Sequence, residues 1–171
     1  MLHATCYCRF VAKSNVGRWP LIGTLATGAG TLYLERESRR DALRVVHTMV
    51  EALERGEVLA VFPEGTTGDG TRVLPFHSGL IQAALIAGAA VQPVAVKFVE
   101  GDTRTPSRAT TYIADDSLVG SIWRTLRAKD LRAVVAFGPP QPAHGRERRA
   151  WTRDLQREIA EILASLPPAI P

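Results

Sequence analysis

A carboxylate lies in a glycine-rich segment directly after a strongly apolar run. The run is Val58–Val61, and Glu64 follows it, with Gly65, Gly68 and Gly70 next along the chain. Because glycine has no Cβ, such a segment allows backbone amides to converge on an anion or on the head group of an acceptor molecule. Glu64 has two possible roles. It hydrogen-bonds a substrate hydroxyl, or it braces its own loop by accepting amide protons.

The position of this loop predicts a binding site. An uninterrupted apolar run is typical of a parallel strand covered on both faces, and ligands of open α/β sheets lie beyond the carboxyl ends of such strands. Pro63 and Glu64 stand at that end, and His77 follows at the start of an expected helix beside the loop. We therefore expect a cleft that includes Pro63 and His77. For His77, packing or head-group contact is favoured over proton transfer.

Strands and helices alternate along the rest of the sequence. Apolar runs bounded by turn residues predict strands, and apolar residues at helical spacing predict helices. The expected strands are 9–12, 30–34, 58–62, 91–98, 110–113 and 133–137, and the expected helices are 19–26, the segment between Ser38 and Gly56, 76–87, 118–127 and 151–162. This alternation indicates an α/β fold with parallel strand pairs. We expect a single domain at 1–164 and a disordered tail at 165–171.

Two apolar segments raise the question of a membrane. Residues 73–96 carry no charge and are long enough to span a bilayer, but prolines, glutamines and a histidine interrupt them, so a buried helix followed by a buried strand is favoured. The last helix has Trp151, Leu155, Ile159 and Ile162 on one face and arginines on the others. It is expected to pack on the domain, and a role at a membrane surface stays open.

The composition restricts the partners. The net charge of +4 and a pI near 9.5 favour an anionic partner, although an arginine-rich composition bias explains them equally well. Nucleic acid is not expected, because no basic helix or aromatic-studded basic strand occurs. Cys6 and Cys8 are too close in sequence for an unstrained bridge and offer too few ligands for a metal, so they fit a reducing compartment.

Four ordered segments resemble motifs of the lysophosphatidic acid (1-acyl-sn-glycerol-3-phosphate) acyltransferase family. The segments are Arg9–Ser14 with Trp19–Gly23, Gly30–Arg36, Phe62–Thr66 and Val91–Val96. The resemblance covers nearly the whole chain and implies the glycerolipid acyltransferase fold, a mixed, mostly parallel sheet flanked by helices. It implies an enzyme that moves a fatty acyl group from acyl-CoA or acyl-carrier protein to a lysolipid hydroxyl. No cofactor or metal is implied, because the thioester supplies the energy.

The same resemblance assigns the acceptor site. It implies that Glu64, Gly65 and Thr66 shape that site and that Arg36, whose planar guanidinium suits phosphate, contacts the acceptor's anionic group. The family usually has arginine where this chain has Thr67, and Arg72 is the alternative phosphate ligand. The Glu-Gly-Thr-Thr-Gly-Asp-Gly sequence is closest to the branch that acylates lyso-ornithine lipids, so the acceptor is either 1-acylglycerol-3-phosphate or lyso-ornithine lipid.

The family's catalytic His-x-x-x-x-Asp motif does not occur in the sequence. The residues five positions after His3, His47, His77 and His144 are Cys8, Ala52, Gln82 and Arg149. We expect the motif upstream of Met1, in a chain truncated at its amino end, and assign no catalytic residue here. The alternative is a remnant that only binds a head group or phosphate. The expected location is peripheral, at the cytoplasmic face of the inner membrane and touching its anionic surface, or soluble in the cytoplasm if an anchor is absent.

Overall fold

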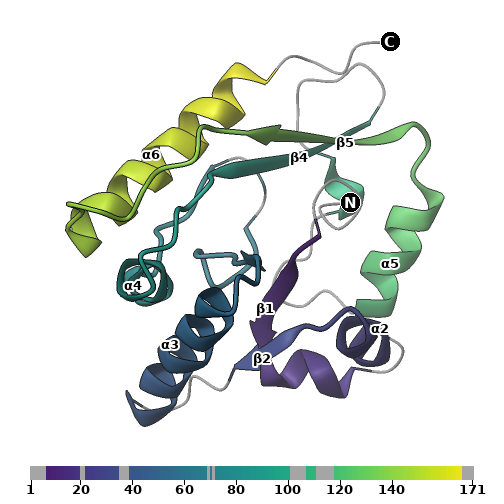
Figure 1. Cartoon of the computed structure of the whole chain (residues 1–171). Coiled ribbons are helices and arrows are strands. Elements are labelled where there is room, and N and C mark those ends of the chain that lie inside the picture. The colour runs from purple at the N-terminus through teal and green to yellow at the C-terminus, as the bar shows by residue number, and fades with distance from the viewer. Residues whose placement is uncertain are drawn as a thin grey trace. The chain divides into compact units, whose positions relative to one another are not determined.

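The computed structural model describes residues 7–19, 22–34, 39–68, 70, 72–100, 107–110 and 118–166 (Figure 1). The chain divides into two compact units. The first unit comprises Met1–Pro63, His77–Val91 and Pro142–Arg149, and the second comprises Glu64–Phe76, Gln92–Gln141 and Ala150–Pro171.

A three-stranded parallel sheet organises the first unit. Its strands are β1 (Arg9–Lys13), β2 (Leu32–Leu34) and β3 (Leu59–Ala60), in the order β2-β1-β3. The register pairs Val11 with Leu32 and Arg9 with Leu59. The parallel pairs confirm the α/β class. β3 is shorter than the expected 58–62, because only Leu59 and Ala60 pair with β1, its single neighbour in the described sheet.

Four helical segments accompany this sheet. They are η1 (Ser14–Arg18), α2 (Ile22–Gly28), α3 (Arg39–Glu54) and α4 (Ser78–Ile86). Within the helix expected at 19–26, Trp19 closes η1 through its amide, 3.1 Å from the Val16 carbonyl, α2 is described from Ile22, and residues 20 and 21 lie outside the described residues. Gly56 ends α3 as expected, in a left-handed conformation with φ +79°. Ser38, the expected cap of α3, lies outside the described residues.

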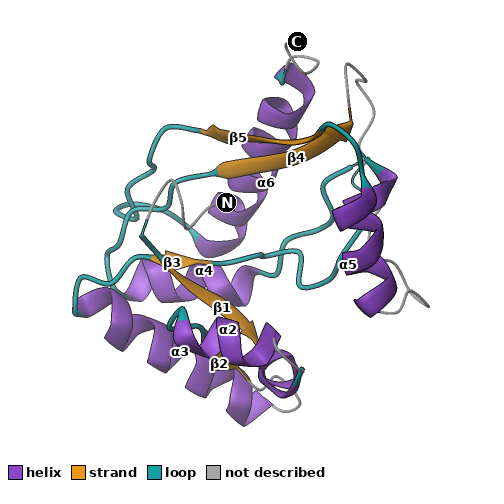
Figure 2. Cartoon of the chain, turned by 90° about the vertical axis from the view of Figure 1, so that its right-hand side faces the viewer, coloured by secondary structure: helices purple, strands orange, loops and turns teal. Residues whose placement is uncertain are grey.

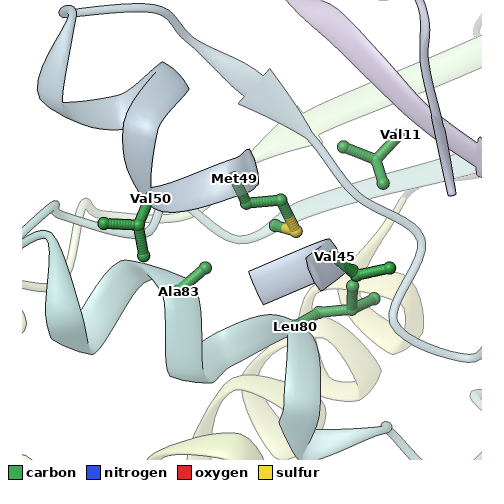
Figure 3. Packing of buried hydrophobic residues seen from close by; sticks show 6 residues of the cluster. All are labelled: Val11, Val45, Met49, Val50, Leu80 and Ala83. Carbon is green, nitrogen blue, oxygen red and sulfur yellow. The ribbon is translucent and has the colours of Figure 1, made fainter. Parts of the chain in front are cut away.

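The core of the first unit joins α3, α4 and β1. The buried residues of this cluster are Val11, Val45, Met49, Val50, Leu80 and Ala83. Figure 3 shows Met49 and Val50 of α3 on the side of Ala83 and Leu80 of α4. Because residues four apart lie on the same face of a helix, the spacing of Val45 and Met49 explains how α3 buries a continuous stripe.

The second unit contains an antiparallel strand pair and two longer helices. The elements are β4 (Val94–Glu100), η2 (Arg108–Thr110), α5 (Leu118–Arg127), β5 (Leu131–Phe137) and α6 (Arg148–Ser165). β4 and β5 pair over seven residues each, so parallel and antiparallel pairs both occur in the chain (Figure 2). The segment 73–96 contains α4 and the start of β4, as interpreted. Within the described ranges, every helix is too short or too polar to cross a membrane.

Two strand predictions in the second unit need correction. The strand expected at 110–113 is wrong at Thr110, which belongs to η2 and donates its hydroxyl to the Ser107 carbonyl at 3.2 Å; residues 111–113 lie outside the described residues. The strand expected at 91–98 begins only at Val94. Pro93 has no amide proton, and its carbonyl accepts the Gly138 amide at 2.8 Å just before the ladder starts.

α6 turns its apolar face inward, as the sequence predicts. Trp151 and Leu155 are 0% and 2% exposed. The Trp151 indole Nε1 donates to Gln141 Oε1 at 2.7 Å, so the one polar atom of the buried ring is satisfied. At Gly138 the approach of α6 is so close that a Cβ would lie 2.7 Å from Glu158 Oε1 and 3.0 Å from Ile162 Cδ1.

Candidate functional site

The exit from β3 is fixed by an aromatic pair and a backbone hydrogen bond, all within the first unit. Phe62 stacks on Phe10, with 6.2 Å between the ring centroids and 6° between the planes. The Pro63 carbonyl then accepts the His77 amide at 2.8 Å. The two residues expected at the cleft, Pro63 and His77, are thus brought together through their backbones.

His77 is the residue that precedes α4, and its backbone is extended there. Its side chain is exposed and makes no capping hydrogen bond to the helix. A histidine acting as a general base needs a group that orients its ring, and no described carboxylate forms an ion pair with it. The preference for contact or positioning over proton transfer at His77 therefore stays the favoured interpretation.

Glu64 braces its own loop in the second unit. Its Oε2 accepts the backbone amide of Leu74 at 2.7 Å, across a separation of ten residues. This is the second of the two roles expected from the sequence. Its other carboxylate oxygen has no hydrogen-bond partner among the described residues. The brace therefore holds one oxygen in place, and contact of Glu64 with an acceptor hydroxyl stays a prediction.

Two glycines of the loop adopt conformations that other residues rarely take. Gly65 has φ +66° and Gly70 has φ +77°, both in the left-handed region. Gly68 differs, because a Cβ there would lie 3.4 Å from Leu74 Cδ1, an ordinary van der Waals contact. The left-handed backbone accounts for glycine at positions 65 and 70, and the expected convergence of backbone amides on an anion or head group stays a prediction.

The polar side chains expected to choose the acceptor lie on the outside of this loop. Thr66, Thr67 and Arg72 are exposed. Arg72 has no ion-pair partner in the described part of the chain. Its guanidinium is therefore accessible to an anionic group in solution. Arg36 lies outside the described residues, which omit 35–38, so its role as a phosphate ligand stays a prediction.

A charged cluster that the sequence analysis missed lies at the opposite ends of the parallel strands. Arg9 at the start of β1 forms an ion pair with Glu57, and its Nε donates to the Gly30 carbonyl at 2.6 Å. Arg55 Nε is 2.9 Å from the other oxygen of Glu57. The hydrogen bond from Arg9, reinforced by that from Arg55, lowers the pKa of Glu57 from its ordinary value of 4.5.

This cluster lines a hollow of about 480 Å³ with Tyr7, Gly56 and Val58. The hollow opens at the amino ends of the strands, whereas substrates of α/β sheets bind at the carboxyl ends. Its arginine is already paired with Glu57, so we regard the cluster as a structural clamp. The signal that could have found it is an arginine at the start of one expected strand and a glutamate just before the start of another, since Arg9 pairs in register with Leu59, two residues after Glu57.

Comparisons with known proteins identify the class. The family described as Acyltransferase matches over residues 1–97. The chain is 36% identical over 159 residues to the lyso-ornithine lipid O-acyltransferase of Pseudomonas aeruginosa, covering 93% of this chain and 60% of the relative. It is 32% identical over 156 residues to the 1-acyl-sn-glycerol-3-phosphate acyltransferase of Neisseria gonorrhoeae, covering 91% and 60%. The chain therefore belongs to the acyltransferase family.

A solved structure agrees in fold. The crystal structure of the 1-acyl-sn-glycerophosphate acyltransferase PlsC from Thermotoga maritima superposes with a TM-score of 0.59 over 96% of this chain and 60% of that chain, at 19% identity. The expected acyltransferase fold is thereby confirmed. The chain spans about 60% of the length of these relatives.

Proposed function

We propose that this chain is the acceptor-binding part of an O-acyltransferase that esterifies a lysolipid with a fatty acyl group from acyl-CoA or acyl-carrier protein. The braced Glu64 loop is the observation that carries the proposal. Its left-handed glycines and the Glu64 oxygen that has no partner among the described residues suit a hydroxyl-bearing head group. The names of the relatives, lysolipid acyltransferases, support the reaction class.

The proposed reaction needs two parts: this loop, which positions the acceptor hydroxyl, and a base, which takes its proton. The acceptor hydroxyl oxygen attacks the thioester carbonyl as its proton passes to a base, and a C–O bond forms. The C–S bond then breaks, and the leaving thiolate takes the proton from the base to become a thiol. No histidine of the printed sequence has an aspartate five residues later. We therefore assign the base to residues outside 1–171 and assign Glu64 to positioning of the hydroxyl.

The preferred acceptor is proposed to be a lyso-ornithine lipid. Thr67 replaces the arginine that the resemblance leads us to expect, and a threonine cannot pair with phosphate as a planar guanidinium does. Arg36 and Arg72 then contact the acceptor's remaining anionic group. The proposed location is the cytoplasmic face of the cell membrane, where a lysolipid acceptor resides.

The test is acyl transfer by the protein made from its own gene, with the natural upstream DNA retained. Both lysolipids are supplied in detergent with a labelled acyl-CoA. Glu64→Ala should lower kcat/KM by roughly tenfold or more, since it removes a charge-assisted hydrogen bond in the acceptor site. Glu161→Ala, on an exposed position of α6, is the matched control and should leave turnover unchanged. Near-normal turnover of Glu64→Ala would refute the site.

A second variant tests which of the two lysolipids the protein prefers. Thr67→Arg should raise the ratio of lysophosphatidic acid to lyso-ornithine lipid acylation by roughly tenfold, because a guanidinium adds a phosphate contact. An unchanged ratio would remove Thr67 from the selection of the acceptor.

A second candidate function is lysolipid binding without transfer. The absence of a His-x-x-x-x-Asp sequence from these residues favours it. Binding of lysolipid to the gene's product, with no ester formed from either acceptor, would establish this alternative in place of the enzyme.

A further inference from the structure

Four apolar side chains of α5 lie on one side of the helix. At about 100° per residue, Val119, Ile122, Trp123 and Leu126 fall within an arc of roughly 100°. Ser121 and Thr125 lie outside this arc. The sequence alone predicts an amphipathic helix here, and such a helix normally buries its apolar side.

In α5 the apolar side is the exposed one. Val119, Ile122, Trp123 and Leu126 are 77%, 41%, 56% and 72% exposed. Ser121, by contrast, is buried. The hydroxyl oxygen of the half-buried Thr125 lies 3.0 Å from the Ala109 carbonyl oxygen and 2.9 Å from the Ser121 carbonyl oxygen, so its single proton is shared between these two acceptors. The polar side of α5 therefore faces the protein, and its apolar side faces outward.

This outward face is an interaction surface. Single exposed apolar residues are ordinary, but a contiguous stripe of four with a tryptophan marks a docking site. The helix is ten residues long, about 15 Å, which is half the thickness of a bilayer core. It can therefore lie along a membrane surface but cannot cross one.

The charges beside the stripe indicate which kind of partner it binds. α5 has Arg124 and Arg127 in its last turn and contains no acidic residue. Arg127 lies over the Trp123 ring, 4.8 Å from its centroid, so a cation and an aromatic ring are presented together. Asp130 and Lys129, which follow the helix, cancel in charge, and Asp115 and Asp116 precede the helix, at the other end of the sequence segment from its arginines. Tryptophan flanked by arginines suits the boundary between anionic head groups and acyl chains.

We propose that α5 docks the protein on an anionic lipid surface, with the stripe of Val119, Ile122, Trp123 and Leu126 buried among the acyl chains and the arginines on the head groups. The choice of a lipid over a protein partner rests on the proposed function, because a lysolipid acceptor resides in a membrane. Neither the family resemblance nor the sequence pattern assigned this helix such a role.

The test is co-sedimentation of the 171-residue chain with vesicles of phosphatidylcholine alone or with phosphatidylglycerol added. The double variant Trp123→Ala, Leu126→Gln should bind the anionic vesicles at least about tenfold more weakly. Leu43→Gln is the matched control, since Leu43 on α3 is also 72% exposed but has no such stripe around it. It should bind like the unaltered chain. Replacing Arg127 by Gln should cost about fivefold, and only on anionic vesicles.

Several outcomes overturn the proposal. One is equal loss of binding in Leu43→Gln and in the α5 variant, and another is vesicle binding that α5 substitutions leave intact. A third is a dimer in sedimentation equilibrium that Leu126→Gln dissociates, with no vesicle binding, since the stripe would then be an interface between two copies.

The proposed function is tested separately, by acyl transfer from the unaltered gene product to a detergent-dispersed lysolipid. Vesicle binding through α5 without any transfer would contradict the enzyme and support the docking surface. Transfer in detergent without vesicle binding would contradict the docking surface alone.

Discussion

α5 and α6 belong to the same unit and have the same kind of sequence, yet they present opposite faces to it. α6 buries Trp151 completely and exposes Arg149, Arg153 and Arg157, whereas α5 exposes Trp123 and holds Ser121 and Thr125 inside. Both helices have an apolar face of similar composition. The difference shows that amphipathicity identifies a helix with two faces but does not say which face the protein covers.

Hydrogen bonds made by a few polar atoms decide the orientation in each case. Trp151 is inside because Gln141 satisfies its indole nitrogen, and Thr125 is inside because the Ala109 carbonyl accepts its hydroxyl proton. Buried polar groups need such partners, and both helices have them. The apolar face of α5 is then left for a partner outside the chain.

The largest predicted effect is the difference in the free energy of unfolding between substitutions of Trp151 and Trp123. Trp151→Ala should lower the free energy of unfolding by about 3–5 kcal/mol, because it leaves a cavity and an unpaired Gln141. Trp123→Ala should change it by less than about 0.5 kcal/mol. Urea titration followed by circular dichroism measures both. Comparable losses at the two positions would mean that the face of α5 is covered within the chain.

A smaller effect tests the inner side of α5. Thr125→Val keeps the shape of the side chain but removes the hydroxyl that reaches the Ala109 carbonyl. The free energy of unfolding should fall by about 1 kcal/mol. Leu126→Gln, one residue on, should leave it unchanged within experimental error. If Leu126→Gln were the more damaging of the two, the assigned orientation of the helix would be wrong.

The smallest predicted effect on stability concerns Glu57, which is held by ion pairs with Arg9 and Arg55 rather than by apolar packing. The pKa of Glu57 is lowered by Arg9 and then by Arg55, so the folded state binds its proton less readily than the unfolded state. The stability that this gives is complete above the ordinary value of 4.5 and is lost as the pH falls through the lowered pKa. Glu57→Gln should flatten that acid loss in urea titrations. An unchanged pH dependence would contradict the clamp.

Much of the fold follows from local patterns in the sequence. Helical spacing predicts α3, α4, α5 and α6, and apolar runs predict β1 and β5, all within a few residues. The loop after β3 is also predictable, because glycine and a carboxylate at a strand end have specific local uses. These features depend on residues close together in the chain.

The features that could not be predicted depend on distant residues. The antiparallel pairing of β4 with β5 joins residues more than thirty positions apart, and the Arg9–Glu57 pair joins two strand starts. The bond between Glu64 and Leu74 joins residues ten positions apart and shows the bracing role, which is only one of the two roles expected from the sequence. The outward face of α5 depends on a threonine and a carbonyl sixteen residues apart. The spacing of apolar residues along the chain does not show which distant residues pair with each other.

Calorimetric titration of the 171-residue chain with lyso-ornithine lipid below its micellar concentration tests the acceptor site most directly. The chain should bind this lipid, Glu64→Ala should bind it at least about tenfold more weakly, and Glu161→Ala should bind it normally. Equal affinity in all three proteins would contradict the claim that the Glu64 loop receives a lysolipid.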